Sequence, residues 1–144
     1  MYRVAREIQF CYGHRLLNYD GKCRHLHGHN GRAIITLESE RLDDLGMVMD
    51  FSAIKRVVNA WIDEALDHKM LLHRDDPALP FLRQQGEPVY VMDVNPTAEN
   101  IARLIYDFAV SKGFPVAEVQ LWETEHCYAV YSSAQRAAES PHRD

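Results

Sequence analysis

The N-terminal segment alternates in polarity. From Tyr2 to Tyr12 every second residue is apolar except Arg6, and most residues between them are polar. A period of two is typical of a strand that buries one face, so we predict a strand here. His14 falls in phase with its apolar row, and the loop "LLNYDGKC" follows it.

A second strand is predicted from about His27 to Glu38. Its apolar row consists of Ala33, Ile35 and Leu37, and His27 and His29 lie on the same odd-numbered face. Two further strands are predicted near the C-terminus, in "AEVQLWETE" and "CYAVYSS", and they are expected to form a hairpin.

Two segments show the three-to-four-residue apolar spacing of amphipathic helices. The first follows the cap Asp50 and extends to about residue 66, and the second begins at the cap Thr97 and ends at Gly113. Between them, "DDPALPFLRQQG" suggests a short helix with Asp76 as cap, Pro77 at its first position and Gly86 as its stop, and "PVYVMD" a short strand. The overall pattern, strand, strand, helix, helix, strand, strand, predicts an α+β fold with an antiparallel sheet and two helices on one face.

Length and composition indicate an ordinary globular domain. The chain has 144 residues, 47% of them hydrophobic, and a formal net charge of −5. We expect one domain over residues 1–132, an inserted loop at about 72–95 and a flexible tail at 133–144. No basic block favours a nucleic-acid or membrane partner, and no leader or apolar span is recognised, so a cytoplasmic protein is expected. There the cysteines stay reduced, and we expect two of them in the core and one as a working thiol.

The segment "CRHLHGH" contains three histidines and a cysteine. His27 and His29 point to one face of a strand, because side chains repeat every two residues, and one Zn²⁺ accepts both imidazoles. His14, at the end of the other strand, is the expected third ligand. Three histidines leave one position of a tetrahedral zinc open, which suits catalysis. His25 is expected near the site, as a supporting, substrate-contacting or simply exposed residue.

Cys23 leaves two alternatives open. As a fourth ligand it would close the metal site and make it structural. As an exposed thiol near cations and a histidine it would gain thiolate character and serve as base or nucleophile.

Two acidic positions are ambiguous from the residues alone. Asp67 and His68 follow the first predicted helix, where the simplest interpretation is a C-terminal histidine stabilised by the helix dipole. A working Asp67–His68 pair would require the helix to have ended, because adjacent helical residues do not face each other. Glu123 closes the row Val119, Leu121, Glu123, and it either emerges into solvent or forms the floor of a pocket for paired N–H donors.

The motifs "FCYGH", "CRHLHGH", "MDFSAIK", "LDHKML", "NPTAENIA" and "WETEHC", in this order, resemble the 6-pyruvoyltetrahydropterin synthase family, most closely its bacterial 6-carboxytetrahydropterin synthase branch of queuosine biosynthesis. The resemblance covers the chain from "IQFCYGHRL" to "LWETEHCYAVY". It implies the T-fold, a four-stranded antiparallel sheet backed by two helices in the order ββααββ. The segment between "LDHKML" and "NPTAEN" looks longer here than in compact members, and "TEH" after Glu123 differs from the smaller residues expected there.

The resemblance also implies roles for individual residues. It assigns zinc to His14, His27 and His29, and the catalytic thiol to Cys23. It makes Asp67 and His68 partners of that thiol in a proton relay, and it makes Glu123 the anchor of the pterin ring. Lys22, Arg24 and Arg15 are the candidates for holding a triphosphate.

The implied reaction converts dihydroneopterin triphosphate to 6-carboxytetrahydropterin, acetaldehyde and triphosphate, with Zn²⁺ as cofactor. The nearest alternative is the pyruvoyl-forming sister reaction. Alternatives of other classes are a non-catalytic, zinc-stabilised binding protein and a zinc hydrolase that needs no thiol.

The outer strands of the expected sheet carry little edge protection. "RAIITLE" and "CYAVYSS" contain few charges and no proline, and open edges promote aggregation unless they are paired or covered. Pairing between subunits would close a barrel. The resemblance implies the same: a hexamer of two trimers, with active sites between subunits.

Overall fold

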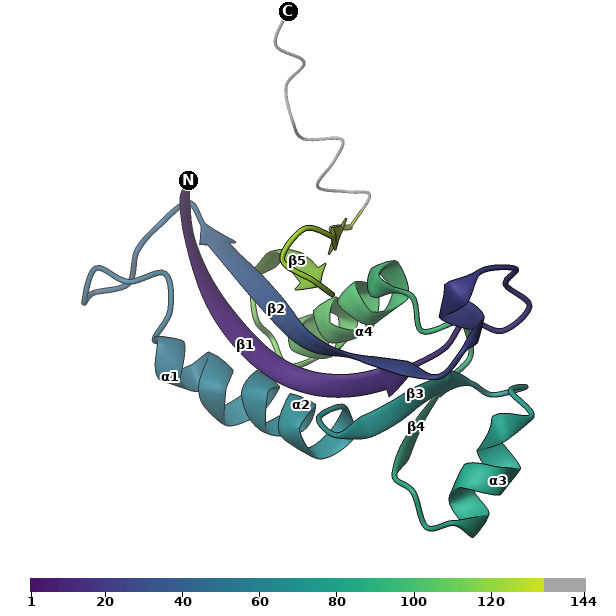
Figure 1. Cartoon of the computed structure of the whole chain (residues 1–144). Coiled ribbons are helices and arrows are strands. Elements are labelled where there is room, and N and C mark those ends of the chain that lie inside the picture. The colour runs from purple at the N-terminus through teal and green to yellow at the C-terminus, as the bar shows by residue number, and fades with distance from the viewer. Residues whose placement is uncertain (134–144) are drawn as a thin grey trace, which may run out of the picture.

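A computed structural model describes residues 1–133 of the chain. The first two strands, β1 (Tyr2–His14) and β2 (His27–Ser39), form a long curved antiparallel ribbon (Figure 1). Both match the predicted strands, and their apolar rows are buried except at the start of β1, where Tyr2 is exposed and Val4 is half-buried. The predicted tail lies almost wholly outside the described residues.

The sheet has six strands in the order β4-β3-β1-β2-β5-β6, so the expected four-stranded sheet is wrong. The strands β5 (Val116–Trp122) and β6 (Tyr128–Tyr131) form the predicted hairpin, and β5 pairs antiparallel with β2. The additional strands β3 (Lys69–His73) and β4 (Val89–Met92) pair in parallel with β1 and with each other. The sheet is therefore mixed, within an α+β fold.

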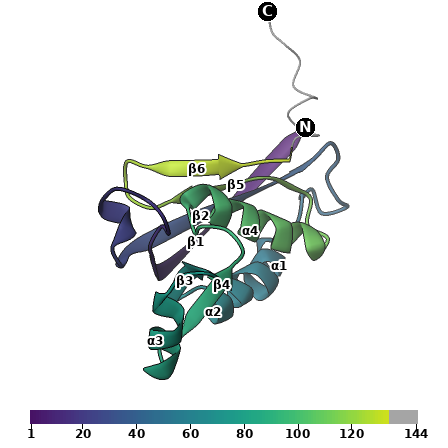
Figure 2. The same cartoon turned by 90° about the vertical axis from the view of Figure 1, so that its right-hand side faces the viewer.

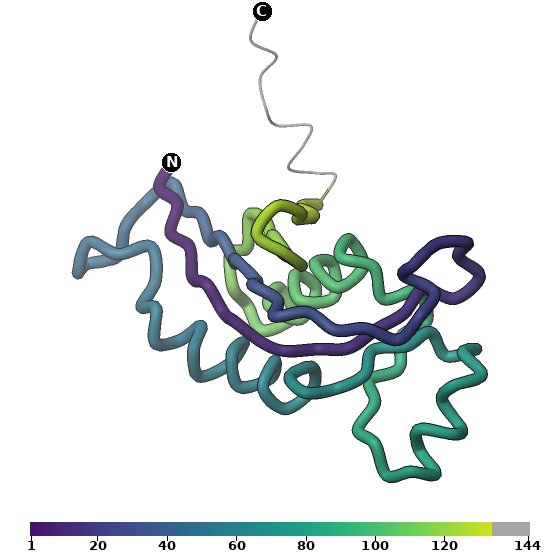
Figure 3. Tube along the Cα trace, viewed as in Figure 1, coloured from purple at the N-terminus to yellow at the C-terminus, as the bar shows by residue number. Residues whose placement is uncertain are grey.

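The region of the expected loop at 72–95 holds regular structure. The end of β3, the helix α3 (Ala78–Gln84) and β4 lie there, and α3 begins directly after Pro77. The Asp76 carboxylate accepts from the backbone N–H of Ala78 at 2.8 Å, so it caps this helix as predicted. This unit and the loop between β1 and β2 lie at the same end of the sheet (Figure 3).

The helices cover one face of the sheet. The first is continuous through α1 (Phe51–Ile54), a π-helical turn (Lys55–Asn59) and α2 (Ala60–Ala65), and the second is α4 (Ala98–Ser111) (Figure 2). Both have the predicted caps: Asp50 accepts from Ser52 N–H, and Thr97 from Asn100 N–H. The core joins their inner faces to the buried rows of β1, β2 and β5, and Trp61 stacks on Phe108 between the helices.

Two smaller expectations need correction. The segment "RAIITLE" belongs to β2, which is paired on both sides, so the edge strands are β4 and β6. The two cysteines expected in the core are not buried there: Cys11 is half-buried and Cys127 is exposed. Within the described residues, none of the helices combines the length and the apolar character needed to cross a membrane.

Candidate metal centre and active site

The register of β1 and β2 brings the three predicted histidines together. His14 lies directly opposite His27, and Tyr12 lies opposite His29. All four side chains lie on the helix-facing side of the ribbon, since they continue its two buried rows. Ring centroids of the three histidines are 4.5–5.1 Å apart, and one ligand atom from each lies within 4.8 Å of the others.

Backbone carbonyls orient two of these imidazoles. The Nδ1–H of His14 donates to the carbonyl of Pro96 at 2.6 Å, and the Nδ1–H of His27 donates to the carbonyl of His25 at 2.7 Å. Each bond leaves Nε2 unprotonated for a metal, as the outer-shell partners of metal-bound histidines commonly do. His25 therefore supports the site through its backbone, while its side chain is exposed.

The spacing and the protonation of the cluster fit a metal ion. The Nε2 atoms of His14 and His29 are 3.1 Å apart, close to the spacing of about 3.3 Å between two tetrahedral ligands at zinc–nitrogen distances. Burial lowers the pKa of His14 to about 4, and burial also lowers the pKa of His29. Both imidazoles are therefore neutral at pH 7, which is the form that binds metal.

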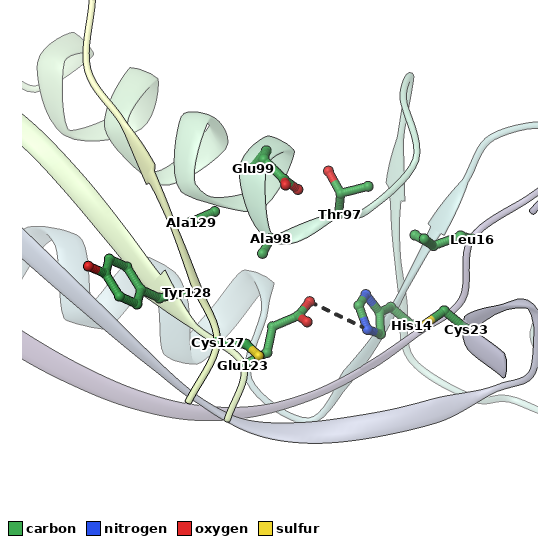
Figure 4. Close-up of a pocket in the computed structure, with 10 residues that line it drawn as sticks. All are labelled: His14, Leu16, Cys23, Thr97, Ala98, Glu99, Glu123, Cys127, Tyr128 and Ala129. Carbon is green, nitrogen blue, oxygen red and sulfur yellow. Dashed lines mark ion pairs between the residues drawn. The ribbon is translucent and has the colours of Figure 1, made fainter. Parts of the chain in front are cut away.

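A cavity of about 320 Å³ opens beside this cluster, and it brings His14, Cys23 and Glu123 together. Figure 4 shows the Glu123 carboxylate pointing toward the His14 ring, while Cys23 lies beyond that ring in this view. Among the described residues, the group that could hold a metal comprises only the three histidines, and Cys23 is outside it. This favours the free-thiol alternative for Cys23. The remaining lining comes from Leu16, the start of α4 and the β5–β6 turn.

Glu123 lines the cavity, and Tyr12 lies next to the histidine cluster, where its ring contacts His14 and His29. The two Glu123 oxygens lie 3.8 Å from His14 Nε2 and 4.0 Å from His29 Nε2. Burial raises the pKa of the Tyr12 phenol, and the neighbouring Glu123 carboxylate raises it further, so Tyr12 keeps its proton. The alternating pattern of β1 predicts Tyr12 only as a core residue. Nothing in the sequence indicates that its hydroxyl lies at the site.

Asp67 and His68 form a hydrogen-bonded pair, but neither residue lines the cavity that contains Cys23 and Glu123. The helix ends before this pair, and His68 adopts a left-handed backbone with φ 57°. The His68 Nδ1–H donates to Asp67 at 2.8 Å, and the backbone N–H of Cys11 donates to the other Asp67 oxygen at 2.8 Å. Partial burial works to raise the pKa of Asp67, but these hydrogen bonds outweigh it and leave the pKa below its usual value.

This pair does not face Cys23 within one chain. His68 lines a separate hollow of about 590 Å³, together with His27, Met70 and Leu82. The helix ends before Asp67 and His68, as a working pair requires. The expected contact of this pair with the Cys23 thiol is not made inside this chain.

Arg15, one of the triphosphate candidates, is already engaged. Its guanidinium forms a bidentate pair with Asp76, whose side chain is fully buried. The pair ties the end of β1 to the start of α3. Lys22 and Arg24 remain exposed on either side of Cys23.

Known proteins that are similar to this chain point to one family. The family model described as "6-pyruvoyl tetrahydropterin synthase" matches residues 3–134. The 6-carboxy-5,6,7,8-tetrahydropterin synthase of Rickettsia felis is 38% identical over 135 residues, which cover 89% of this chain and 98% of the relative. The Haemophilus influenzae protein of the same name is 27% identical, covering 91% of this chain and 99% of its own.

Solved structures show the same fold. An uncharacterized protein of Wolinella succinogenes superposes with a TM-score of 0.74 at 29% identity, covering 91% of this chain and 97% of its own. The 6-pyruvoyl tetrahydropterin synthase of Caenorhabditis elegans superposes with a TM-score of 0.69 at 22% identity, covering 92% and 96%. From the family match, its span and the identity to these relatives, the chain belongs to the 6-pyruvoyl tetrahydropterin synthase family.

Proposed function

We propose that this protein is a zinc-dependent 6-carboxytetrahydropterin synthase of queuosine biosynthesis. It would convert dihydroneopterin triphosphate to 6-carboxytetrahydropterin, acetaldehyde and triphosphate. The observation that carries the proposal is one cavity in which His14, a member of the three-histidine cluster, meets a free thiol and a carboxylate. The names of the Rickettsia and Haemophilus relatives favour the carboxy product over the pyruvoyl product.

The residues fit a zinc ion held by His14, His27 and His29. Nitrogen ligands at this spacing, with one position left for substrate, are those of a catalytic zinc site. When bound, zinc would supply Lewis acidity to oxygens of the substrate side chain. The Pro96 and His25 carbonyls hold two of the rings in the required tautomer.

Cys23 is proposed as the base that removes a proton from the substrate side chain. It is half-buried at the cavity wall, and Lys22 and Arg24 flank it in the 3-10 turn Lys22–Arg24. The thiolate is the reactive form of a cysteine. Lys22 and Arg24 are also proposed to hold the triphosphate, because Arg15 is occupied by Asp76.

Glu123 is proposed to anchor the pterin ring. A carboxylate can accept two parallel N–H bonds, here from the ring nitrogen and the exocyclic amine of the pterin. Its place inside the cavity, three-quarters shielded from solvent, favours this role over that of a surface carboxylate.

Asp67 and His68 are proposed to complete the site of a neighbouring subunit. Asp67 orients His68, whose imidazole is largely exposed and available for proton transfer to a second chain. Two edge strands, β4 and β6, are open for pairing between subunits. A hexamer with shared active sites accounts for both features.

Incubation with dihydroneopterin triphosphate, followed by mass analysis of the products, tests the proposal. We expect 6-carboxytetrahydropterin and acetaldehyde from the zinc-loaded protein and no turnover after chelation. Formation of 6-pyruvoyltetrahydropterin instead would identify the sister reaction. Binding of zinc without any turnover would indicate a non-catalytic zinc protein.

The metal half of the proposal has its own test. Purified protein should carry about one zinc per chain, and a His27→Ala, His29→Ala double variant should lose it. Full retention of zinc by that variant would contradict the assignment of these ligands.

A further inference from the structure

Tyr12 carries a hydroxyl that the proposed chemistry does not use. Its side chain is 1% exposed, and within residues 1–133 its oxygen has no hydrogen bond of ordinary geometry, although the Glu123 carboxylate lies close enough to raise its pKa. Buried polar groups in native proteins are nearly always paired, so such an oxygen calls for a partner that is present in the working state.

The packing of the Tyr12 ring fixes the position of its hydroxyl. The ring stacks on Phe10 at 5.2 Å and contacts His14 and His29 with centroid distances of 5.3 and 5.7 Å. Gly31 leaves the space for the ring, because a Cβ at that position would lie 2.8 Å from Tyr12 Cε1. The hydroxyl is therefore fixed at the wall of the metal centre, beside the Glu123 carboxylate.

Glu123 is placed ambiguously between two roles. Its oxygens lie 3.8 and 4.0 Å from the Nε2 atoms of His14 and His29. Two ligands of a tetrahedral zinc are about 3.3 Å apart, and carboxylate oxygens are good zinc ligands. The two Glu123 distances exceed this ligand spacing by roughly 0.5 and 0.7 Å, so a small movement of the carboxylate would bring one of its oxygens toward the open position of the metal. That would block the substrate and remove the proposed pterin anchor.

We propose that Tyr12 is a positioning residue that donates its O–H to the Glu123 carboxylate and so holds this carboxylate off the metal. A carboxylate has about four lone-pair sites. One bond from Tyr12 leaves enough of them to accept two N–H donors from a flat heterocycle. The metal keeps its fourth position, and Glu123 keeps its orientation toward the ring-binding part of the cavity. The pterin half of this inference rests on the proposed function, whereas the metal half does not.

Zinc affinity without substrate tests the metal half. Metal-stripped protein is titrated with zinc against a chromophoric chelator, and four proteins are compared: wild type, Tyr12→Phe, Glu123→Gln and the double variant. Phe keeps the ring and its packing. We expect Tyr12→Phe to bind zinc about tenfold more tightly, the lower end of effects from outer-shell partners, because Glu123 becomes a ligand.

The double variant decides whether Glu123 is responsible. Tyr12→Phe with Glu123→Gln should return to within about twofold of wild type, as should Glu123→Gln alone, well below the tenfold scale of an outer-shell effect. Tyr106→Phe, a buried tyrosine on α4 that packs on Tyr131, is the matched control and should leave zinc affinity unchanged. An unchanged affinity in Tyr12→Phe, or an equal gain in the Glu123→Gln background, would overturn the proposal.

Pterin binding is measured separately by the fluorescence of neopterin with the zinc-loaded proteins. Tyr12→Phe should weaken it about tenfold, comparable to the loss of an outer-shell partner, and Tyr106→Phe should not. If wild type binds zinc but no pterin, the proposed function fails while the zinc comparison still tests the Tyr12–Glu123 contact. If pterin binds equally well to wild type and Tyr12→Phe, the positioning role of Tyr12 toward the ring is refuted.

Discussion

Acidification of the metal-free protein should destabilise it through His14. This imidazole is 3% exposed, and burial outweighs its hydrogen bond to the Pro96 carbonyl to give a pKa of about 4. In the unfolded chain the same group returns to its ordinary pKa of 6.5. The folded state therefore keeps the His14 imidazole neutral, which is the form that binds metal, and disfavours its protonation.

The direction and size of the effect follow from the two pKa values. Above pH 6.5 His14 is neutral in both states and contributes nothing. As the pH falls from 6.5 toward 4, only the unfolded chain takes up the proton, so the free energy of unfolding decreases. The loss is about 2 kcal/mol at pH 5 and approaches about 3 kcal/mol below pH 4, where the folded state is protonated too.

Urea unfolding of chelator-treated protein at pH 7 and pH 5 measures this loss. Burial also lowers the pKa of His29, so wild type is compared with His14→Gln, which shares every group except His14. The depressed carboxyl groups Asp50, Asp67 and Asp76 lose their contribution only below about pH 4, outside this window. We expect the variant to be less sensitive to pH by about 2 kcal/mol. Equal losses in the two proteins would refute the argument that His14 is buried as a neutral ligand.

Four further predictions concern the site, the fold and the assembly. Cys23→Ser should keep zinc and fold but lose turnover by roughly 10²-fold or more, the scale of a general base, in steady-state assays; loss of zinc would make Cys23 a ligand. Glu123→Gln should weaken pterin binding in fluorescence titrations and leave zinc unaffected, since one acceptor becomes a donor; unchanged pterin affinity would make it a surface carboxylate. Asp76→Asn should lower the free energy of unfolding by about 3 kcal/mol, because it leaves Arg15 unpaired beside a buried group, whereas Asp93→Asn at an exposed ion pair should change it by less than about 1 kcal/mol. Light scattering should show a hexamer whose dissociation abolishes activity, and a fully active monomer would contradict the shared site.

The grouping of His14, His27 and His29 could be predicted from the sequence because that part of the fold is local in pattern. The two-residue period of the strands predicts that His14 ends one buried row and that His27 begins another. It is then enough to know that both rows face the core. Their exact opposition in the β1–β2 register is a further step, and only the structure supplies it. The caps Asp50 and Thr97 were equally readable, since a capping side chain bonds to the backbone two or three residues away.

The short strand predicted in "PVYVMD" is β4, whereas β3 was harder to predict for a physical reason. β3 buries the consecutive residues Leu71 and Leu72, so it lacks the alternation that marks a half-exposed strand. Its partners are also distant in sequence: β1 lies parallel to it, and parallel pairing leaves no hairpin turn to read. The five-residue segment therefore looked like the end of a helix followed by a loop.

For two residues near the site, Arg15 and Tyr12, the sequence pattern does not predict the surroundings of the polar group. Arg15 looked like a phosphate ligand because its partner Asp76 is 61 residues away, and only the fold shows that this charge is already neutralised. Tyr12 looked like one more apolar residue in an alternating row. Its ring does pack as the row requires, but the same packing fixes a buried hydroxyl beside the histidine cluster. A polar atom at the tip of an aromatic residue is invisible to hydrophobic periodicity, so the residues that adjust a site can be hidden among those that build the core.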